Sequence, residues 1–465
     1  MAGYSHVTLA EFRSGVLTRL GDPTAVFWSL PEITTYINET LRTWQFFSGF
    51  WQHKGLFLAV GNQVWYEIPL LLKDENQDLL IPYSVTDREL VVALEYALLE
   101  PATTDWTLPW LATSGRTDQF SYELLTQQVQ QALDNFLQDT GLVVKVEELP
   151  VPAGSDHIDL GQDYFETIRC AWIEYVDPLV KTWSPMRASD YQNAQSYLDL
   201  LTPATPTSYE NFLSPQPGLY LYPTNSDVGA LEIVSVKAGS RISPTTAPLA
   251  LQIPADLSWM VKYAALDNLL DSDGQTRDEP RAEYCRARYE DALKIARKYG
   301  SLLSAEVNGI PARIAPITSK DAYSPGWQNT TGEPDQILTA GWNLIALSPV
   351  PGESASNPQG NYDVTLWVMR NAPVVSADDD TIDLPDSLLA MIEDFVCHLA
   401  LFKTAGKEWQ KSWSAYETLL KEAMDYNEYL KAQARNLSIS KQRGTEVETS
   451  SYPRRDTDLL TKEAA

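Results

Sequence analysis

The chain has 465 residues, of which 44% are hydrophobic and 21% charged, so it is long enough for several folded domains and too apolar for a disordered protein. Its 35 lysines and arginines stand against 62 aspartates and glutamates, and the formal net charge of −27 argues against a protein that grips nucleic acid by its phosphates. Neither a secretion signal nor a bilayer-spanning run of roughly 20 apolar residues is present, and three widely spaced cysteines, Cys170, Cys285 and Cys397, favour a reducing compartment.

The N-terminal segment predicts two helices. Apolar residues of Val7–Leu20 fall largely on one helical face, and Gly21-Asp22-Pro23 ends that helix. A second helix begins at Ser29, which is a suitable N-cap with Pro31 in the first turn. Its apolar stripe continues to Phe47.

Strand-like segments follow. Alternating apolar residues in Leu56–Val60 and Val64–Ile68, on either side of Gly61-Asn62, predict a β-hairpin. Two later segments, Asp87–Pro101 and Asp163–Pro178, resemble each other because each has an initial Asp, an apolar run and an acid–Pro end. The aromatic and β-branched residues of the second favour a strand, so we predict strands for both.

A helix over Phe120–Gly141 lies between these two segments and is followed by a strand at Leu142–Val146. It corresponds to the earlier helix over Ser29–Gly49. The N-terminal half is therefore predicted to hold two similar helix and β-hairpin units, over residues 1–112 and 113–200.

The C-terminal half contains a second duplication. Leu219–Pro223 matches Ile345–Pro349, and Leu231–Val236 matches Val364–Val368. In each copy an apolar residue and a proline then precede two helices joined by a short loop. The predicted helices are Leu257–Asp271 and Arg281–Tyr299 in the first copy, and Leu388–Thr404 and Lys407–Ala434 in the second.

These patterns predict an α+β fold. Tandem helix plus β-hairpin units form its N-terminal half, and strand plus antiparallel helical-hairpin units, over residues 201–313 and 314–435, form its C-terminal half. Residues 436–465 lose apolar periodicity and are predicted to form an extended arm that orders on a partner. The basic residues of this arm, which we take as candidates for binding an acidic partner, are Lys441, Arg443, Arg454 and Arg455.

Candidate metal ligands are isolated. Asp156, His157 and Asp159 resemble a metal pair, but no third ligand signal accompanies them. Asp271-Ser272-Asp273-Gly274 resembles the centre of a calcium loop, but the first ligand position is Leu269, and a turn between helices accounts for the string.

Catalytic signals are equally weak. His398 lies on an apolar helix and is predicted to be a satisfied buried histidine, and Asp378-Asp379-Asp380 is predicted to be a solvated turn. The sequence holds no nucleophile elbow, no phosphate-binding glycine loop and no His-Glu-x-x-His motif. We therefore predict no catalytic residues, no cofactor, no bound metal and no enzymatic activity.

Several lines of the sequence resemble tailed-phage head–tail connector (adaptor or neck) proteins. They are TLAEFRSGVLTRLGD, WSLPEITTYINETLRTW, the Pro206–Tyr209 loop, the strand ending at Pro223, the Ile253-Pro254 helix entry and the helix pair around Asp271–Cys285. The resemblance implies a ring-forming structural protein of the virion neck, made in the host cytoplasm, that docks on the portal, continues the DNA channel and attaches the tail. The chain is about twice as long as a single-unit connector, so the resemblance implies a duplicated form.

The implied partners are the portal protein, a tail or nozzle protein and further copies of the chain. Binding to a membrane is not expected. DNA would pass through an acidic lumen without sequence-specific binding. The implied portal is twelve-fold, so twelve copies satisfy it directly and six doubled chains satisfy it indirectly; we favour twelve because the repeats have diverged. The alternatives are another virion protein, such as a baseplate or fibre-attachment protein, and thirdly an enzyme such as a wall-degrading hydrolase.

Overall fold

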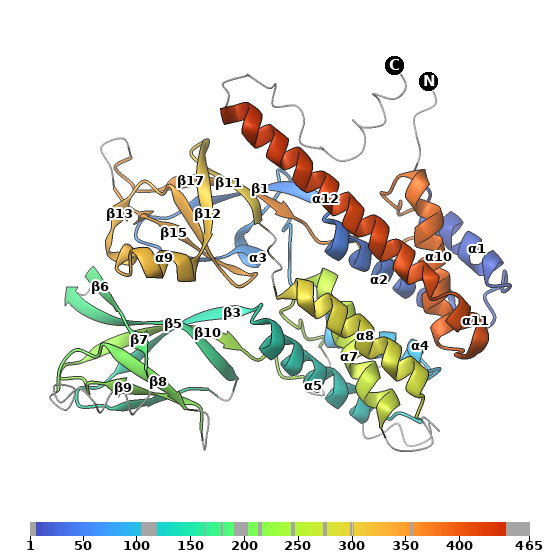
Figure 1. Ribbon diagram of the computed structural model, residues 1–465, viewed down its shortest axis with the longest axis horizontal. Coiled ribbons are helices and arrows are strands. Elements are labelled where there is room, and N and C mark those ends of the chain that lie inside the picture. Colours follow the sequence, from blue (N-terminus) through green and yellow to red (C-terminus); the bar gives the residue numbers. More distant parts are fainter. Residues whose placement is uncertain are drawn as a thin grey trace.

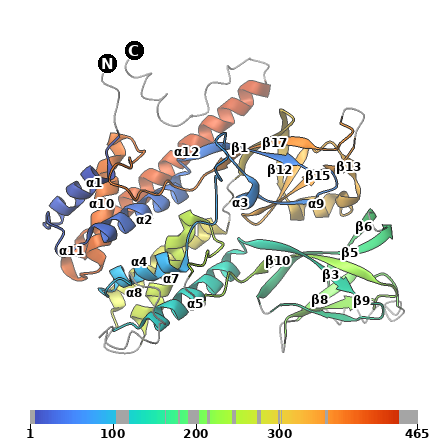
Figure 2. The same cartoon turned by 180° about the vertical axis from the view of Figure 1, so that it is seen from behind.

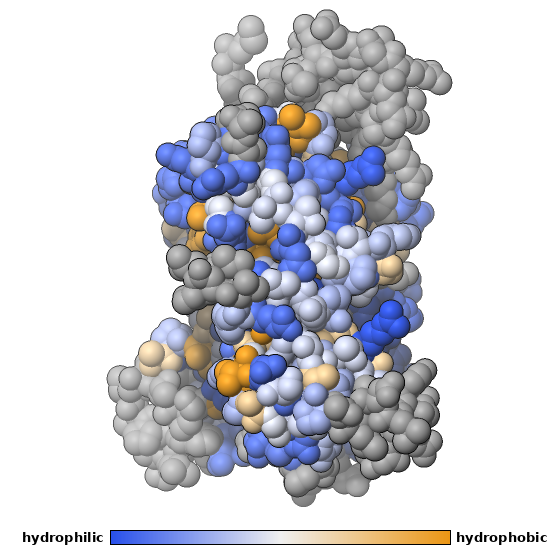
Figure 3. Space-filling view, turned by 90° about the vertical axis from the view of Figure 1, so that its left-hand side faces the viewer, coloured by the Kyte–Doolittle hydropathy of each residue, from blue (hydrophilic) through white to orange (hydrophobic). Residues whose placement is uncertain are grey.

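The computed structural model has helices at one end of the molecule and β-sheets at the other (Figures 1 and 2), which confirms the predicted α+β class. The structure describes residues 6–442 except 104–118, 162, 178–179, 190–202, 213–215, 243–246, 273–276, 298–299, 301 and 354–356. No helix among these residues is long and apolar enough to cross a membrane. The face at the sheet end is mostly hydrophilic, with small separate apolar patches (Figure 3).

Two groups of elements are interleaved along the chain. We call residues 6–83 together with 302–442 the outer unit, and residues 84–297 the inner unit. Each unit has its own helices and its own strands, and the N-terminal part of each unit pairs with the C-terminal part of the same unit.

The outer unit is helical at both ends of its sequence. Its main helices, which pack on one another, are α1 (Leu9–Arg19), α2 (Leu30–Ser48), α10 (Asp386–Phe402) and α12 (Ser414–Gln442). Its short helices are α3 (Ile68–Leu71), α9 (Ile317–Tyr323), η4 (Trp327–Asn329) and α11 (Gly406–Lys411).

The inner unit has the same distribution. Its helices are α4 (Asp87–Ala97), α5 (Tyr122–Thr140), the short η3 (Ala255–Leu257), α7 (Ser258–Asp271) and α8 (Glu279–Ala296). Helix α5 packs on α4 and α7, and α7 packs on α8.

Among the described residues, the strands of the outer unit form one seven-stranded sheet of order β1-β17-β11-β12-β14-β15-β2. Its strands are β1 (Gln52–Ala59), β2 (Trp65–Glu67), β11 (Leu302–Val307), β12 (Ile310–Pro316), β14 (Gln336–Ala340), β15 (Leu344–Ser348) and β17 (Tyr362–Met369). A small separate pair is formed by β13 (Thr331–Gly332) and β16 (Val350–Pro351).

The inner strands form two sheets, of orders β3-β10-β5-β6 and β4-β9-β8-β7, within the described part of the chain. They are β3 (Val144–Val151), β4 (His157–Asp159), β5 (Tyr164–Asp177), β6 (Val180–Pro185), β7 (Arg187–Ala188), β8 (Ser208–Phe212), β9 (Gly218–Tyr222) and β10 (Gly229–Lys237).

Capping residues fix the helix ends. Thr8 and Ser29 close capping boxes at the starts of α1 and α2, and Ser121 caps α5 through the Leu124 amide. Gly49 and Gly141 end α2 and α5 with positive φ angles of 64° and 59°, a conformation that glycine adopts without steric cost.

Both helix groups share one hydrophobic core. A single cluster of buried residues joins Trp44 and Phe395 of the outer unit to Leu133 and Trp259 of the inner unit. Burial of this size is the main favourable contribution to folding, and it fixes the two units against each other.

The predicted strand over Asp87–Pro101 is wrong: residues 87–97 form helix α4. The Thr86 side chain caps its first turn, and Leu90, Val91 and Leu94 are buried at helical spacing. The segment compared with it, Asp163–Pro178, does form a strand, β5, so the resemblance between the two segments does not reflect shared structure.

The predicted hairpins are also wrong in their pairing. Both strands around Gly61-Asn62 exist, but β1 pairs with β17 and β2 pairs with β15. In the inner unit, β3 pairs with β10 and β4 with β9. Each of these strands therefore pairs with a strand that comes much later in the sequence.

The C-terminal helices agree with prediction. Pro254 and Pro385 are the N-caps of η3 and α10, and α7, α8 and α10 follow the predicted ranges closely. The last predicted helix is divided into α11 and α12.

Helix α12 continues to Gln442, so the extended arm expected from residue 436 is wrong for residues 436–442. The division at residues 112, 200, 313 and 435 stays a prediction.

Candidate functional site: the contact between the two units

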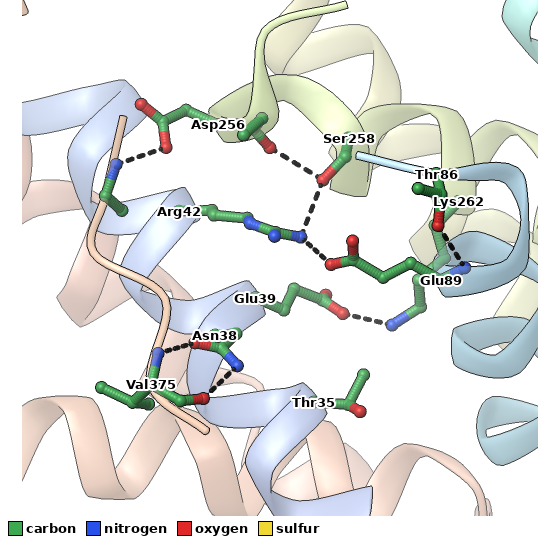
Figure 4. Close-up of polar contacts among 12 residues, drawn as sticks. Thr35, Asn38, Glu39, Arg42, Thr86, Glu89, Asp256, Ser258, Lys262 and Val375 are labelled. Atoms are coloured by element: carbon green, nitrogen blue, oxygen red, sulfur yellow. Dashed lines mark hydrogen bonds and ion pairs between the residues drawn. The ribbon is translucent and has the colours of Figure 1, made fainter. Parts of the chain in front are cut away.

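The two units meet along α2, which lies between the outer helices and the inner helix α7. Glu39 of α2 is buried, with 6% of its side chain exposed, and it forms an ion pair with Lys262 of α7 (Figure 4). Its second oxygen accepts a hydrogen bond of 3.0 Å from the Tyr263 hydroxyl. The Arg288 guanidinium of α8 lies 3.8 Å away. A single buried carboxylate therefore lies between two buried cations and is the countercharge nearest to both.

Aromatic rings of both units surround Arg288, whose side chain is 1% exposed. The closest, Tyr263, has its ring centroid 4.0 Å from the guanidinium carbon. Outer-unit rings also contribute, with Tyr416 at 4.8 Å and Phe395 at 5.2 Å. Cation–π attraction is strongest for desolvated pairs, so Arg288 holds α10 and α12 against the inner unit.

A second ion pair crosses the same contact. Arg42 of α2 donates to Glu89 of α4 at 2.5 Å and to the Ser258 hydroxyl at 3.4 Å (Figure 4). Beside it, a cleft of about 480 Å³ lies between α2, α4, α7 and the outer-unit segment 374–376.

Asp256 of η3 is fully buried and accepts a hydrogen bond of 3.0 Å from the Ala372 amide of the outer unit. Burial raises the pKa of its carboxyl to about 7, against the opposing effect of that hydrogen bond. Burial therefore favours the neutral form of this carboxyl, which joins the units through its hydrogen bond from the Ala372 amide.

The sheet ends of the units are joined in the same manner. Arg169 of β5 is 4% exposed and pairs with Glu232 of β10 at 2.8 Å and with Asp321 of α9 at 3.0 Å. The Asn343 side chain of the outer unit bonds both backbone groups of Val144 in β3. The contact between the units thus runs from the helical end to the sheet end.

His398 of α10 is buried between the units, as predicted. Its two ring nitrogens lie 2.7 Å from the Tyr284 hydroxyl and 2.8 Å from the Ser412 hydroxyl. Burial, with the nearby Arg288 charge, lowers the pKa of this imidazole to about 3. Both of its ring nitrogens have hydrogen-bond partners and its side chain is fully buried, as expected of a packing residue.

The other predicted residues stand apart from this contact. His157 is exposed and bonds the neighbouring Asp156 carboxylate at 2.8 Å, which raises the pKa of the imidazole. Asp271 ends α7 and pairs with Arg286, while Asp273 and Gly274 lie outside the described residues. Asp378–Asp380 form a turn whose last carboxylate accepts two backbone amides, as the prediction of a solvated turn implies.

The described residues contain no group of three or more His, Cys, Asp or Glu placed to hold a metal ion. Cys170 and Cys285 are buried, which raises the pKa of both thiols and makes them poor nucleophiles. Of the four basic arm residues, Lys441 lies in the last turn of α12, and Arg443, Arg454 and Arg455 lie outside the described residues.

Sequence reasoning did not single out Glu39, Arg42, Lys262 and Arg288, which all lie on helices. The sequence held a signal for Glu39 and Arg42, because both lie among the apolar residues Leu41, Trp44 and Phe46. In the structure, residues 39–48 of α2 are buried on every side of the helix. Each of these two charged residues pairs with a residue of the inner unit, Glu39 with Lys262 and Arg42 with Glu89, so these charges are suited to joining two bodies and do not form a converging catalytic set.

Comparison with known families bears on the inner unit. Residues 98–308 match the family model of the SU10 adaptor protein. The match supports a phage adaptor-type protein. The family is a structural one and not a known enzyme class. No curated protein matches the chain.

Proposed function

We propose that this chain is a structural head–tail adaptor of a tailed phage and a component of the virion neck. It forms a ring, docks on the portal, continues the DNA channel and attaches the tail. The observation that carries the proposal is the family match over residues 98–308, which covers most of the inner unit from the end of α4 onward.

The charge of the chain supports a conduit. With a formal net charge of −27, a ring of such subunits repels the phosphates of DNA and lets DNA pass without holding it. The same charge makes subunits repel one another, so we propose that the chain assembles on the portal and that added salt favours the ring.

The proposal includes a duplicated form, with two adaptor units in one chain. The copy number of the ring is then twelve chains, or six if both units of each chain occupy equivalent positions. Closed rings repeat one heterologous contact, so the choice depends on whether the two units make equivalent contacts.

The C-terminal arm is proposed to bind the portal through its basic residues. Removing residues 443–465 leaves every described contact of α12 in place, so we expect an unchanged circular dichroism spectrum and unfolding midpoint. Because Arg443, Arg454 and Arg455 are lost, we expect weaker binding to the purified portal, by about tenfold, measured by sedimentation of portal complexes.

A matched control replaces the acidic arm residues Glu446 and Glu448 with glutamine, which keeps the arm length and should not weaken binding. If the truncated chain bound the portal as tightly as the full chain, the arm would have no docking role. If even the full chain failed to bind portal or virion, the adaptor function itself would be wrong.

A further inference from the structure

We propose that the chain contains two copies of one fold, the inner unit inserted into the outer unit, and that neighbouring chains join by repeating the contact between these units. In the repeated contact, the exposed face of α5 in one chain binds the exposed face of α10 in the next chain. The repeat of one fold stands on its own, and the joining of chains rests on the proposed ring-forming function.

The order of strands is the first support. The inner sheets have the orders β3-β10-β5-β6 and β7-β8-β9-β4, and β6 is followed by β7 after the single residue Met186. When β6 and β7 are counted as one bent strand, the inner strands follow the order β3-β10-β5-β6/β7-β8-β9-β4. The outer sheet has the same order of equivalent strands, with β1 in the place of β3 and β2 in the place of β4. The outer equivalent, β12, likewise pairs with β11 by its first part and with β14 by its second.

Strand direction and register agree as well. Strand β12 is parallel to β14, and β7 is parallel to β8. Strands β14 and β8 each pair with all five residues of β15 and β9. At the sheet edge, β2 pairs with the first three residues of β15, and β4 pairs with the first three residues of β9.

The first helix of each unit starts in the same way. Thr8 caps α1 and Thr86 caps α4, each through its side chain. Thr8 forms an antiparallel bridge with Thr381, and Thr86 forms one with Ala250, in both cases shortly before the proline that begins the later helices.

The second helix agrees in length and in both ends. Helices α2 and α5 each have 19 residues, with a serine N-cap and a glycine C-cap in the left-handed conformation. Each is followed by a strand of 8 residues, β1 or β3, which pairs with the last strand of its own unit.

Chain order completes the correspondence. The outer elements α1, α2, β1 and β2 match α4, α5, β3 and β4, and the elements from β11 to α12 match those from β5 to α8. The inner unit therefore interrupts the outer one between β2 and β11. A family match of one unit's length over residues 98–308 fits this arrangement.

The two units contact each other head to tail. Helix α2 of the outer unit faces η3 and α7 of the inner unit. In Figure 1 the helices follow one another as α10 and α12, α2, α7 and α8, and then α5, so the order within one unit repeats in the next. Helix α5, the equivalent of α2, and helix α10, the equivalent of α7, therefore lie at opposite ends of this row of helices.

Residues of α2 and α7 that are buried in the contact between the units have exposed equivalents on α5 and α10. On α2, Glu39, Thr43 and Phe46 are buried, whereas the equivalent α5 residues Gln131, Asn135 and Gln138 are exposed. On α7, Trp259 and Tyr263 are buried, whereas the equivalent α10 residues Ala390 and Asp394 are exposed.

The open faces are polar. By equivalence with Glu39, Lys262 and Tyr263, the Gln131 amide of one copy lies against Glu393 and Asp394 of the next. These two carboxylates pair with Arg19 of their own chain but stay 23% and 49% exposed. An amide donates hydrogen bonds to carboxylates, and such bonds are stronger than neutral ones. Each chain supplies two successive units, so the ring contains half as many chains as units.

Cross-linking tests this contact. In a Cys397→Ser background, particles assembled with Gln138→Cys and Ala390→Cys are treated with a short bismaleimide. These positions are equivalent to Phe46 and Trp259, whose rings lie 5.9 Å apart in the internal contact. We expect a ladder of cross-linked chains up to the full ring. The control pairs Gln138→Cys with Ile310→Cys, the exposed first residue of β12, and should give no ladder.

Charge variants give an independent measurement. Gln131→Glu places a third carboxylate against Glu393 and Asp394 of the next copy, and we expect about fivefold weaker ring assembly. Gln131→Lys should strengthen assembly by a similar factor. Equal effects of the two variants would contradict the proposed contact.

The outcomes of cross-linking separate the contact from the function. Particles that incorporate the cysteine variant but give no ladder would refute the contact and leave the adaptor function standing. Absence of the wild-type chain from the neck would refute the function.

Discussion

Replacing Glu39 with alanine is expected to lower the free energy of unfolding by about 3–5 kcal/mol, the range for breaking a buried ion pair. The change removes the partner of Lys262 and Arg288, which are 3% and 1% exposed, and leaves both cations without a countercharge. Chemical denaturation followed by tryptophan fluorescence measures the effect, because Trp259 and Trp44 lie in the shared core.

The matched control is Gln131→Ala at the equivalent, exposed position of α5, which should change the free energy of unfolding by about 0.5 kcal/mol or less. Replacing Glu39 and Lys262 together by leucine should recover part of the loss, because it removes the unpaired Lys262 charge, whereas Arg288 still lacks its countercharge. A loss below about 1 kcal/mol for Glu39→Ala would show that the contact between the units does not depend on this charge.

Acid is expected to destabilise the protein through His398. Burial holds the folded-state pKa near 3, whereas the unfolded imidazole has a pKa of 6.5. Between these values the unfolded state binds a proton that the folded state does not. Stability from this group is therefore complete above pH 6.5 and is lost at about 1.4 kcal/mol per unit as the pH falls towards 3.

The variant His398→Gln removes this dependence while keeping donor and acceptor groups near Tyr284 and Ser412. We expect it to be less stable than wild type at pH 7 but to lose less stability between pH 6.5 and pH 4.5, measured as denaturation midpoints across that range. The control His157→Gln removes an exposed imidazole whose pKa is raised in the folded state, so it should lose at least as much stability towards acid as wild type. If the curve of His398→Gln ran parallel to wild type, the buried neutral histidine would not be the acid-sensitive group.

Local sequence patterns predicted most helices and strands but not their partners. Capping serines, the glycines at positions 49 and 141 and the prolines at 254 and 385 act within one or two turns, so their effects can be predicted from neighbouring residues. Asp87–Pro101 was mistaken for a strand because its short apolar run suits either structure, and the Thr86 cap was not weighed.

Pairing of β1 with β17 and of β3 with β10 brings together segments far apart in the chain, and no local pattern encodes it. For the same reason, similarity between segments predicts tandem units only, and the proposed insertion of one unit into the other depends on the strand order of the sheets. The charged contact was missed because Glu39 and Lys262 are ordinary surface residues in sequence and become buried only when the two units meet.

The central claim is that this chain forms a ring between portal and tail. An electron-microscopic reconstruction of the phage neck, resolved well enough to trace helices, tests it most directly. The account predicts a closed ring of this chain on the portal, coaxial with the DNA, in which each chain contributes two successive, similar units and α5 of one chain lies against α10 of the next. Density for the chain as a dimer or trimer elsewhere in the particle, or its absence from the head–tail junction, would contradict the account.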